Sequence, residues 1–399
     1  MYSKNEGDNL NGYRRWWLTV LLGVGLAVAL IGHSFSPASA QSTFQTASPA
    51  AELRGVWLTN IDSDVLFSRD NLGLAIRRLK RLNFNTIYPT VWNWGYTLYP
   101  SQVAERVVGR SIDPHPGLAR RDMLAEAVIR GHRRGLTVIP WFEFGLMAPA
   151  DSDLVSRHPD WVTNRLDGGQ VIYEGTHPRV WLSPTHPEVR QMLLDLVREV
   201  VTNYDVDGIQ FDDHFGMPVE LGYDPYTVRL YQQEHGGNSP PDDPHDLEWV
   251  RWRADQITSL MSEVFRTVKA QKPRAIVSLS PNPWEFAYET YLQDWFTWER
   301  QGLIEELIVQ VYRDDFERFT SELQRPEMQL AKTHIPVAIG ILTGLRNRPV
   351  SMEQIQTQVR SVREQQFAGV SFFFYETLGD RDASFRALFR QSVTRPRAG

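Results

Sequence analysis

The chain has 399 residues, of which 42% are hydrophobic, 23% charged and 12% aromatic, a composition typical of a globular protein with a sizeable core. The formal charge of −6 is spread without a long run of one sign, which argues against nucleic acid as a partner. There is no cysteine, so disulfides, zinc–thiolate sites and thiol nucleophiles are excluded, and any chemistry must come from carboxylates, His, Ser or Tyr.

The first forty residues follow the order of an export signal. Arg14 and Arg15 precede an apolar run over 18–31, and Pro37 and the small-residue triplet 38–40 follow it. The run is shorter than the roughly 20 residues that a membrane-spanning helix needs. We therefore predict a signal peptide over 1–40 that is cleaved after Ala40, followed by an unstructured lead-in over 41–51. The arginine pair also fits twin-arginine export, so the export route stays open.

From residue 52 onward, short runs rich in β-branched and aromatic residues alternate with amphipathic helical stretches. The eight predicted strands are Arg54–Thr59, Thr86–Trp92, Thr137–Phe142, Gly208–Asp212, Ala275–Ser280, Leu307–Tyr312, Pro336–Ile341 and Gly369–Tyr375. Helices are predicted after them, among others at Asn71–Leu82, Met123–Arg134, Glu188–Tyr204, Asp246–Ala270, Met352–Gln366 and Ala383–Ser392. Eight such units without a linker predict an α/β fold, a single (β/α)8 barrel over 52–393 with a tail over 394–399.

The stretches after strands two, three and four are longer than the others. Loops that follow strands build the carboxyl-terminal face, where barrel enzymes hold their sites. The long loops therefore predict a groove for an extended substrate, with passive surface insertions as the alternative.

Alternation of side chains along each strand predicts which of them face the barrel interior. In the fourth strand Ile209 and Phe211 suit the helix layer, so Gln210 and Asp212 face inward, with Asp212 at the carboxyl end. The same rule turns further side chains inward: Trp141, Glu143, Ser278, Ser280, Asn282, Gln310 and Tyr312. Leaving buried polar groups unpaired costs about 1–3 kcal/mol each, a cost that is tolerated mostly at functional sites.

Asp212 and Glu143 end adjacent strands in the same layer and form the candidate catalytic pair. Glu376, near the end of the eighth strand, is the substitute for Glu143, and Glu285 is a third choice. The candidate substrate-binding residues around them are Trp92, Trp94, Trp141, Asp213, His214, Asn282, Trp284, Gln310 and Tyr312. Tryptophan offers a flat apolar face and one N–H donor to a sugar ring, although the same aromatics also suit a plain core.

Several segments together resemble the glycosyl hydrolase-like family ten of bacterial envelope and secreted proteins. They are Glu52–Asn60 (ELRGVWLTN), Asn85–Tyr88 (NTIY), Leu98–Ser101 (LYPS), Trp181–Pro184 (WLSP) with His186–Arg190 (HPEVR), and Val206–Asp213 (VDGIQFDD). The resemblance spans about residues 51 to 392. It implies a (β/α)8 fold and hydrolysis of glycosidic bonds in an envelope or extracellular polysaccharide, with peptidoglycan glycan strands as one candidate.

Carried over by residue, the resemblance matches Asp212 and Asp213 to the family's paired acids, and Arg54 and Asn60 to its first-strand motif. Asn60 thereby joins the candidate substrate-binding residues. Two positions depart from the family pattern. Glu143-Phe144-Gly145 stands where many members carry Asn-Pro-Tyr, and Ser183 replaces a common Asn or Asp. The first departure leaves open whether Glu143 is a subgroup feature or a general catalyst.

Glycoside hydrolysis needs one protonated carboxyl as acid and one ionised carboxylate as nucleophile or base. Polar neighbours favour the ionised role for Asp212, and the apolar neighbours Trp141 and Phe142 favour the acid role for Glu143. Whether the reaction retains or inverts configuration depends on the carboxyl separation, so both outcomes stay open. We expect a monomer that acts on a polysaccharide without a cofactor or metal, in the periplasm or outside the cell.

Two other functions stay open. A non-catalytic glycan-binding barrel would use the same groove and tryptophans. A metal-dependent polysaccharide deacetylase would use Asp212, Asp213 and His214 as ligands, but no His-x-His or His-x-x-x-His motif accompanies them.

The export signal gives the first testable prediction. N-terminal sequencing of the exported protein should start near Gln41. An exported form that keeps residues 1–40 would contradict cleavage.

Overall fold

A computed structural model describes residues 51–345 and 348–397, so the predicted signal peptide and most of the lead-in lie outside the described residues. The main sheet is all parallel, with the strand order β5-β2-β1-β16-β13-β12-β11-β10-β6. Its strands are β1 (Leu53–Leu58), β2 (Thr86–Pro89), β5 (Thr137–Val138), β6 (Trp141–Phe142), β10 (Gly208–Asp212), β11 (Ile276–Ser280), β12 (Glu306–Gln310), β13 (Val337–Leu342) and β16 (Gly369–Phe373).

The two ends of this sheet are two halves of one strand. Only Ile139 and Pro140 separate β5 from β6, and proline has no N–H to continue a ladder. The Ile139 N–H donates to Ile87 on the β2 side, and the Pro140 carbonyl accepts from the Gln210 N–H on the β10 side. The sheet therefore closes into an eight-stranded barrel, which confirms the predicted fold class.

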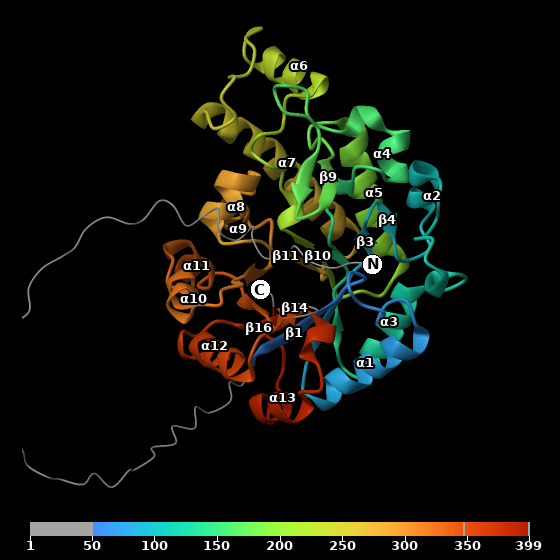
Figure 1. Cartoon of the computed structure of the whole chain (residues 1–399), viewed down its shortest axis with the longest axis vertical. Coiled ribbons are helices and arrows are strands. Elements are labelled where there is room, and N and C mark those ends of the chain that lie inside the picture. The colour runs from blue at the N-terminus through green and yellow to red at the C-terminus, as the bar shows by residue number, and fades with distance from the viewer. Residues whose placement is uncertain (1–50, 346–347, 398–399) are drawn as a thin grey trace, which may run out of the picture. The chain divides into compact units, whose positions relative to one another are not determined.

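Helices follow each strand and surround the barrel, with β1 and β16 side by side (Figure 1). They are α1 (Arg69–Arg81), α2 (Gln102–Val108), α3 (Met123–His132), α4 (Asp153–Arg157), α5 (Pro187–Asn203), α6 (Pro225–Glu234), α7 (Leu247–Gln271), α8 (Trp284–Tyr291), α9 (Trp295–Arg300), α10 (Phe316–Leu323), α11 (Pro326–Ala331), α12 (Met352–Glu364) and α13 (Asp382–Leu388). In α1 the Ser68 side chain caps the first turn, and a stripe over 72–79 packs inward. None of the helices in the described ranges is long and apolar enough to cross a membrane.

Three small sheets stand outside the barrel in the loops that follow its strands. They are β3 (Trp92–Asn93) with β4 (Tyr96–Thr97), β7 (Met147–Pro149) with β9 (His177–Trp181) and β8 (Ile172–Glu174), and β14 (Gly344–Leu345) with β15 (Arg348–Pro349). The predicted second strand over Thr86–Trp92 is therefore too long. Trp92 has left the barrel and pairs with Thr97 in the antiparallel hairpin β3–β4.

The alternation predicted for the fourth strand is present. Ile209 and Phe211 belong to the core between sheet and helices, whereas Gln210 faces the barrel interior. There Gln210 accepts a hydrogen bond from Trp57 at 2.7 Å and donates one to Ser278 at 2.9 Å. The sequence rule therefore places the polar interior correctly.

The floor of the barrel is built around a buried ion pair. Glu306 on β12 accepts hydrogen bonds from Ser278 at 2.9 Å and Tyr88 at 3.0 Å, and it pairs with Arg395. Arg395 lies in the segment expected to be a tail, and its neighbour Thr394 accepts a hydrogen bond from the Glu52 N–H at 2.9 Å. This last segment is therefore in contact with the start of the barrel.

Removing Arg395 tests this floor. Arg395→Ala should lower the free energy of unfolding by about 3–5 kcal/mol, because it leaves the Glu306 carboxylate buried without its counter-ion. Urea denaturation measures the change. The double variant Arg395→Ala/Glu306→Gln should recover part of the loss, and an unchanged single variant would show that the pair contributes nothing.

Candidate active site

The predicted polar side chains meet in a cavity of about 130 Å³ at the carboxyl end of the barrel strands. Its lining residues are Trp57, Trp141, Glu143, Asp212, Asp213, His214, Ser280, Gln310, Tyr312 and Phe373. They come from β1, β6, β10, β11, β12 and β16 or from the residues that follow these strands. A closed parallel barrel brings these strand ends together although they are far apart in sequence.

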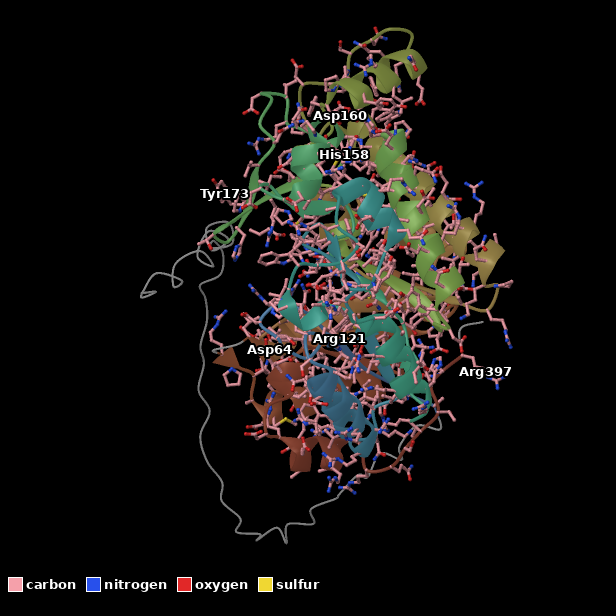
Figure 2. The ribbon with its side chains drawn as sticks, turned by 90° about the vertical axis from the view of Figure 1, so that its right-hand side faces the viewer. Asp64, Arg121, His158, Asp160, Tyr173 and Arg397 are labelled. Carbon is pink, nitrogen blue, oxygen red and sulfur yellow. The ribbon has the colours of Figure 1, made fainter. Side chains whose placement is uncertain are left out.

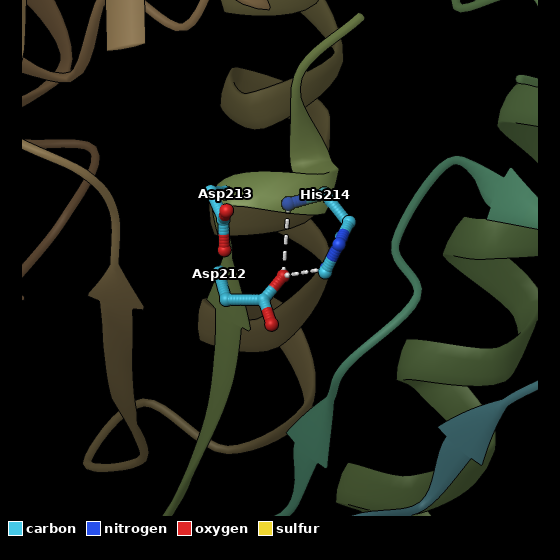
Figure 3. A group of neighbouring side chains, drawn as sticks. All are labelled: Asp212, Asp213 and His214. Carbon is cyan, nitrogen blue, oxygen red and sulfur yellow. Dashed lines mark hydrogen bonds and ion pairs between the residues drawn. The ribbon is translucent and has the colours of Figure 1, made fainter. Parts of the chain in front are cut away.

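Asp212 ends β10 and is only 2% exposed. Its Oδ2 accepts a hydrogen bond from the Trp141 indole at 3.0 Å, and its Oδ1 accepts one from the His214 N–H at 2.9 Å. The His214 imidazole also lies 3.2 Å from Oδ1, so backbone and ring both face this carboxylate (Figure 3). Burial raises the pKa of Asp212 to about 6, although His214 acts in the opposite direction.

Glu143 follows β6 and is 5% exposed. Its Oε2 accepts hydrogen bonds from the Thr90 hydroxyl and the Asn93 amide, both at 2.9 Å, and from Thr59 at 3.2 Å. Burial and the nearby Asp212 raise the pKa of Glu143 to about 8. Near neutral pH, Glu143 therefore holds a proton while Asp212 is ionised.

The segment after Glu143 packs directly against the segment after Asp212. Gly145 has a positive φ of 44°, and a Cβ there would lie 2.6 Å from the His214 carbonyl oxygen. The same carbonyl accepts the Leu146 N–H at 2.9 Å. Glycine at 145 therefore lets these two backbones meet, which fixes the positions of the two carboxyl groups relative to each other.

Asp213 and His214 form the polar wall beside the pair. Asp213 accepts hydrogen bonds from the amides of Asn282 and Gln310, each at 3.0 Å. His214 Nδ1 lies 2.9 Å from the Glu143 carbonyl oxygen, and Nε2 lies 3.6 Å from Glu174. Burial lowers the pKa of His214, but Asp212 and Asp213 outweigh it and hold that pKa well above the ordinary value. The two carboxylates therefore favour the protonated form of the His214 imidazole.

Asp212, Asp213 and His214 place ligand-type atoms within 4.8 Å of one another. Their surroundings do not fit a metal ion, however. N–H donors from Trp141, Asn282 and Gln310 already point at the carboxylate oxygens. The set is better suited to hydrogen-bonded carboxylates than to metal ligation.

The structure places the predicted site residues in three ways. The following predicted residues line the cavity or contact a lining carboxylate: Trp141, Glu143, Asp212, Asp213, His214, Asn282, Gln310 and Tyr312. Asn60 and Trp94 lie behind or beside it. Asn60 accepts from Asn93, which holds Glu143, and Trp94 is exposed on the hairpin β3–β4.

Four other candidates do not line this cavity: Trp92, Trp284, Glu285 and Glu376. Trp92 is fully buried in the core of the helix layer, and Trp284 stacks on Tyr288 and donates to Asp294. Glu285 is an exposed partner of Arg325.

Glu376 lines a separate cavity of about 340 Å³ with Phe374 and Arg381. Burial raises the pKa of Glu376 to about 7, and its carboxylate accepts a hydrogen bond from Ser63. Of the three acids proposed from the sequence, Glu143 is therefore the one that shares a cavity with Asp212.

Sequence reasoning missed several residues of the site. Thr90 continues the inward alternation of Tyr88, so strand parity could have found it. Asn93 and Glu174 lie on hairpins outside the barrel, and Phe373 ends a strand whose alternation is ambiguous in the sequence. No sequence signal identifies these last three.

The sequence matches the family described as glycosyl hydrolase-like 10 over residues 52–361, and the chain belongs to this family. The glycosyl hydrolase DigH of Escherichia coli (strain K12) is 25% identical over 328 residues, which cover 69% of each chain. The glycosyl hydrolase YngK of Bacillus subtilis (strain 168) is 24% identical over 299 residues, covering 65% of this chain and 54% of YngK.

Two solved structures with the same fold carry the names of glycosidases. The glycoside hydrolase domain of PgaB (BpsB) from Bordetella bronchiseptica superposes with a TM-score of 0.63 at 13% identity and covers 86% of this chain and 99% of that domain. The catalytic domain of β-amylase from Paenibacillus polymyxa gives a TM-score of 0.58 at 10% identity, with the same coverage of 86% and 99%. At such identities the likeness establishes the fold.

The raised pKa of Glu143 predicts a pH-dependent stability difference. The folded protein keeps this proton up to about pH 8, whereas the unfolded chain releases it near pH 4.3, so this carboxyl destabilises the fold increasingly as pH rises between those values. Glu143→Gln removes the ionisation. The free energy of unfolding of the variant minus that of the wild type, from urea denaturation, should increase between about pH 5 and about pH 9. A difference independent of pH would mean that Glu143 has the same pKa in the folded protein as in the unfolded chain.

Proposed function

We propose that this protein is a glycoside hydrolase that cleaves a cell-envelope or extracellular polysaccharide by carboxylate acid–base chemistry. The observation that carries the proposal is the pairing of Glu143 and Asp212 in one cavity at the barrel mouth, with pKa values of about 8 and about 6. Two carboxyls whose environments separate their pKa values are what glycoside hydrolysis requires. Membership of a glycosyl hydrolase-like family supports the same reaction class.

Glu143 is suited to be the general acid. Its Oε2 accepts from Thr90 and Asn93, so Oε1, which has only a long contact of 3.5 Å to Thr59, is the oxygen free to carry the proton. In the reaction this proton goes to the leaving glycosidic oxygen as the bond to the anomeric carbon breaks. Thr90 and Asn93 then stabilise the carboxylate that remains.

Asp212 is suited to be the ionised partner. The Trp141 N–H, the His214 N–H and the His214 imidazole all favour its carboxylate form. It would either attack the anomeric carbon or activate the water that does so. Trp141 donates to one carboxylate oxygen and the His214 N–H donates to the other, so the carboxylate keeps one orientation in the cavity.

The predicted signal peptide favours an envelope or extracellular substrate. The first forty residues have the order of a signal peptide, and the relatives DigH and YngK carry glycosyl hydrolase names. We propose action in the periplasm or outside the cell on a glycan chain, with peptidoglycan glycan strands among the candidates and no cofactor or metal.

The proposal is tested by incubating the purified protein with peptidoglycan glycan strands, chitin oligosaccharides, alginate and soluble glucans. Mass spectrometry should find shortened chains with new reducing ends from at least one of them. Asp212→Asn should lower that turnover by about 10²–10⁴-fold without loss of fold. Products that have lost acetyl groups while their glycosidic bonds stay intact would identify a deacetylase.

A glycan that binds without cleavage, with equal binding to Asp212→Asn, would identify a glycan-binding barrel.

The assignment of the acid has its own control. Glu143→Gln should turn over an aryl glycoside with a good leaving group far better than the natural polymer, because that leaving group needs no protonation. The same rescue in Glu376→Gln, and not in Glu143→Gln, would move the acid role to Glu376.

A further inference from the structure

The hairpin β3–β4 carries an aromatic side chain in an unusual place. Its two-residue turn consists of Trp94 and Gly95, with φ values of 58° and 79°. Both values are positive, as in a type I′ turn, for which Asn-Gly is the favoured sequence. A bulky side chain in the left-handed region costs on the order of 1–2 kcal/mol. The turn therefore keeps an indole where the backbone alone would favour asparagine.

Burial in the core does not offset this cost, because Trp94 is 40% exposed. One of its faces is covered by the guanidinium of Arg179 on β9, whose Cζ lies 5.4 Å from the ring centroid. The remaining exposed surface is therefore the opposite face and the ring edge. An exposed aromatic face held in a strained turn is an indication of function rather than of packing.

Arg179 is itself an unusual support. It is 6% exposed, and its guanidinium lies against two rings, Trp94 and Phe144, whose ring centroids are 5.4 and 5.1 Å from Cζ. Its ion-pair partner is Glu174, at 3.5 Å. A buried cation in contact with both rings restrains Trp94 on the side that faces Arg179.

The same residues connect Trp94 to the catalytic cavity. Asn93, the preceding residue, donates to Glu143 at 2.9 Å. Glu174 lies 3.6 Å from His214, which contacts Asp212. Trp94 is thus adjacent in sequence to Asn93, which orients the proposed acid. A chain of four contacts, through Arg179, Glu174 and His214, connects it to the proposed nucleophile or base, Asp212.

We propose that the outer face of Trp94 is a binding subsite for a pyranose ring of the polysaccharide, one or more units away from the bond that is cleaved. This inference rests on the proposed function. It adds the position at which the glycan is bound outside the cavity. The face of a pyranose ring presents C–H groups that pack on an indole. The cavity of about 130 Å³ is small, so a longer glycan must continue across the surface beside it.

Because the hairpin also holds Glu143, binding at Trp94 helps to position the acid. Binding energy from a remote unit is then expressed in kcat as well as in KM. Long chains should therefore be turned over faster than short ones, and cleavage should occur inside a chain rather than at its last sugar.

Trp94→Asn tests the subsite with a residue that the turn prefers. The melting temperature should be retained or raised, because Asn-Gly fits the type I′ turn. Turnover of the polymer identified in the glycan panel should fall about tenfold in kcat/KM, equivalent to ~1.4 kcal/mol, and more than turnover of the matching aryl glycoside. Trp94→Tyr keeps an aromatic face and should recover most of the polymer turnover.

Tyr173→Ala is the matched control. Tyr173 is 69% exposed and lies on β8, where it pairs with Pro178. Side chains alternate along a strand, so Tyr173 lies on the opposite face of the β8–β9 hairpin from Glu174 and Arg179. Figure 2 shows the position of Tyr173 on this hairpin. This variant should keep the polymer turnover of the wild type.

Three results would overturn the subsite. They are equal losses on polymer and aryl glycoside in Trp94→Asn, no loss on either, or a fall in melting temperature that Trp94→Tyr reverses without restoring polymer turnover. If the wild type cleaves none of the glycans, the proposed function fails, and the subsite is then judged by native-gel binding to each polysaccharide of the panel. Weaker binding by Trp94→Asn, and not by Tyr173→Ala, would still support it.

Discussion

The site depends on the burial of two carboxyl groups in one cavity, which raises the pKa of both, and the nearby Asp212 raises that of Glu143 further. Asp212 ends β10 and Glu143 directly follows β6, so the pairing of these adjacent strands brings the two carboxyl groups together, and the backbone contact at Gly145 holds them there. In a low-dielectric cavity two neighbouring carboxylates cannot both ionise at little cost, and one keeps its proton. The surrounding donors decide which one it is. The His214 imidazole lies against Asp212, whereas Glu143 is surrounded by neutral hydroxyl and amide groups.

Much of this could be predicted from the sequence, because strand alternation is a strict rule. Ile209 and Phe211 on one face required Gln210 and Asp212 on the other, and the same argument carried Gln310 and Trp141 to the interior. The eight strand and helix units were also visible, since a barrel repeats one local pattern. What the pattern predicts well is therefore the barrel and the residues at the ends of its strands.

The sequence does not predict residues whose position in the fold differs from what their local pattern indicates. Pro140 divides the third strand without changing its hydrophobic pattern, and Trp92 continues the apolar run of β2 although it belongs to a hairpin. Glu174 reaches His214 from a sheet that contributes nothing to the barrel. Glu376 looked equivalent to Glu143 because both follow a strand, but a separate cavity surrounds it. Such cases depend on contacts between distant loops, which no single-sequence period encodes.

The pairing of the first and last strands has a consequence for how the chain reaches its native state. Leu53 on β1 lies opposite Gly369 on β16, and Arg395 supplies the counter-ion of Glu306. During synthesis from the amino end, the ring of strands therefore stays open until β16 has emerged. Contacts of such long sequence separation also form slowly. The cavity at the barrel mouth is accordingly complete only after β16 has been synthesised, and its floor only after Arg395 has joined Glu306.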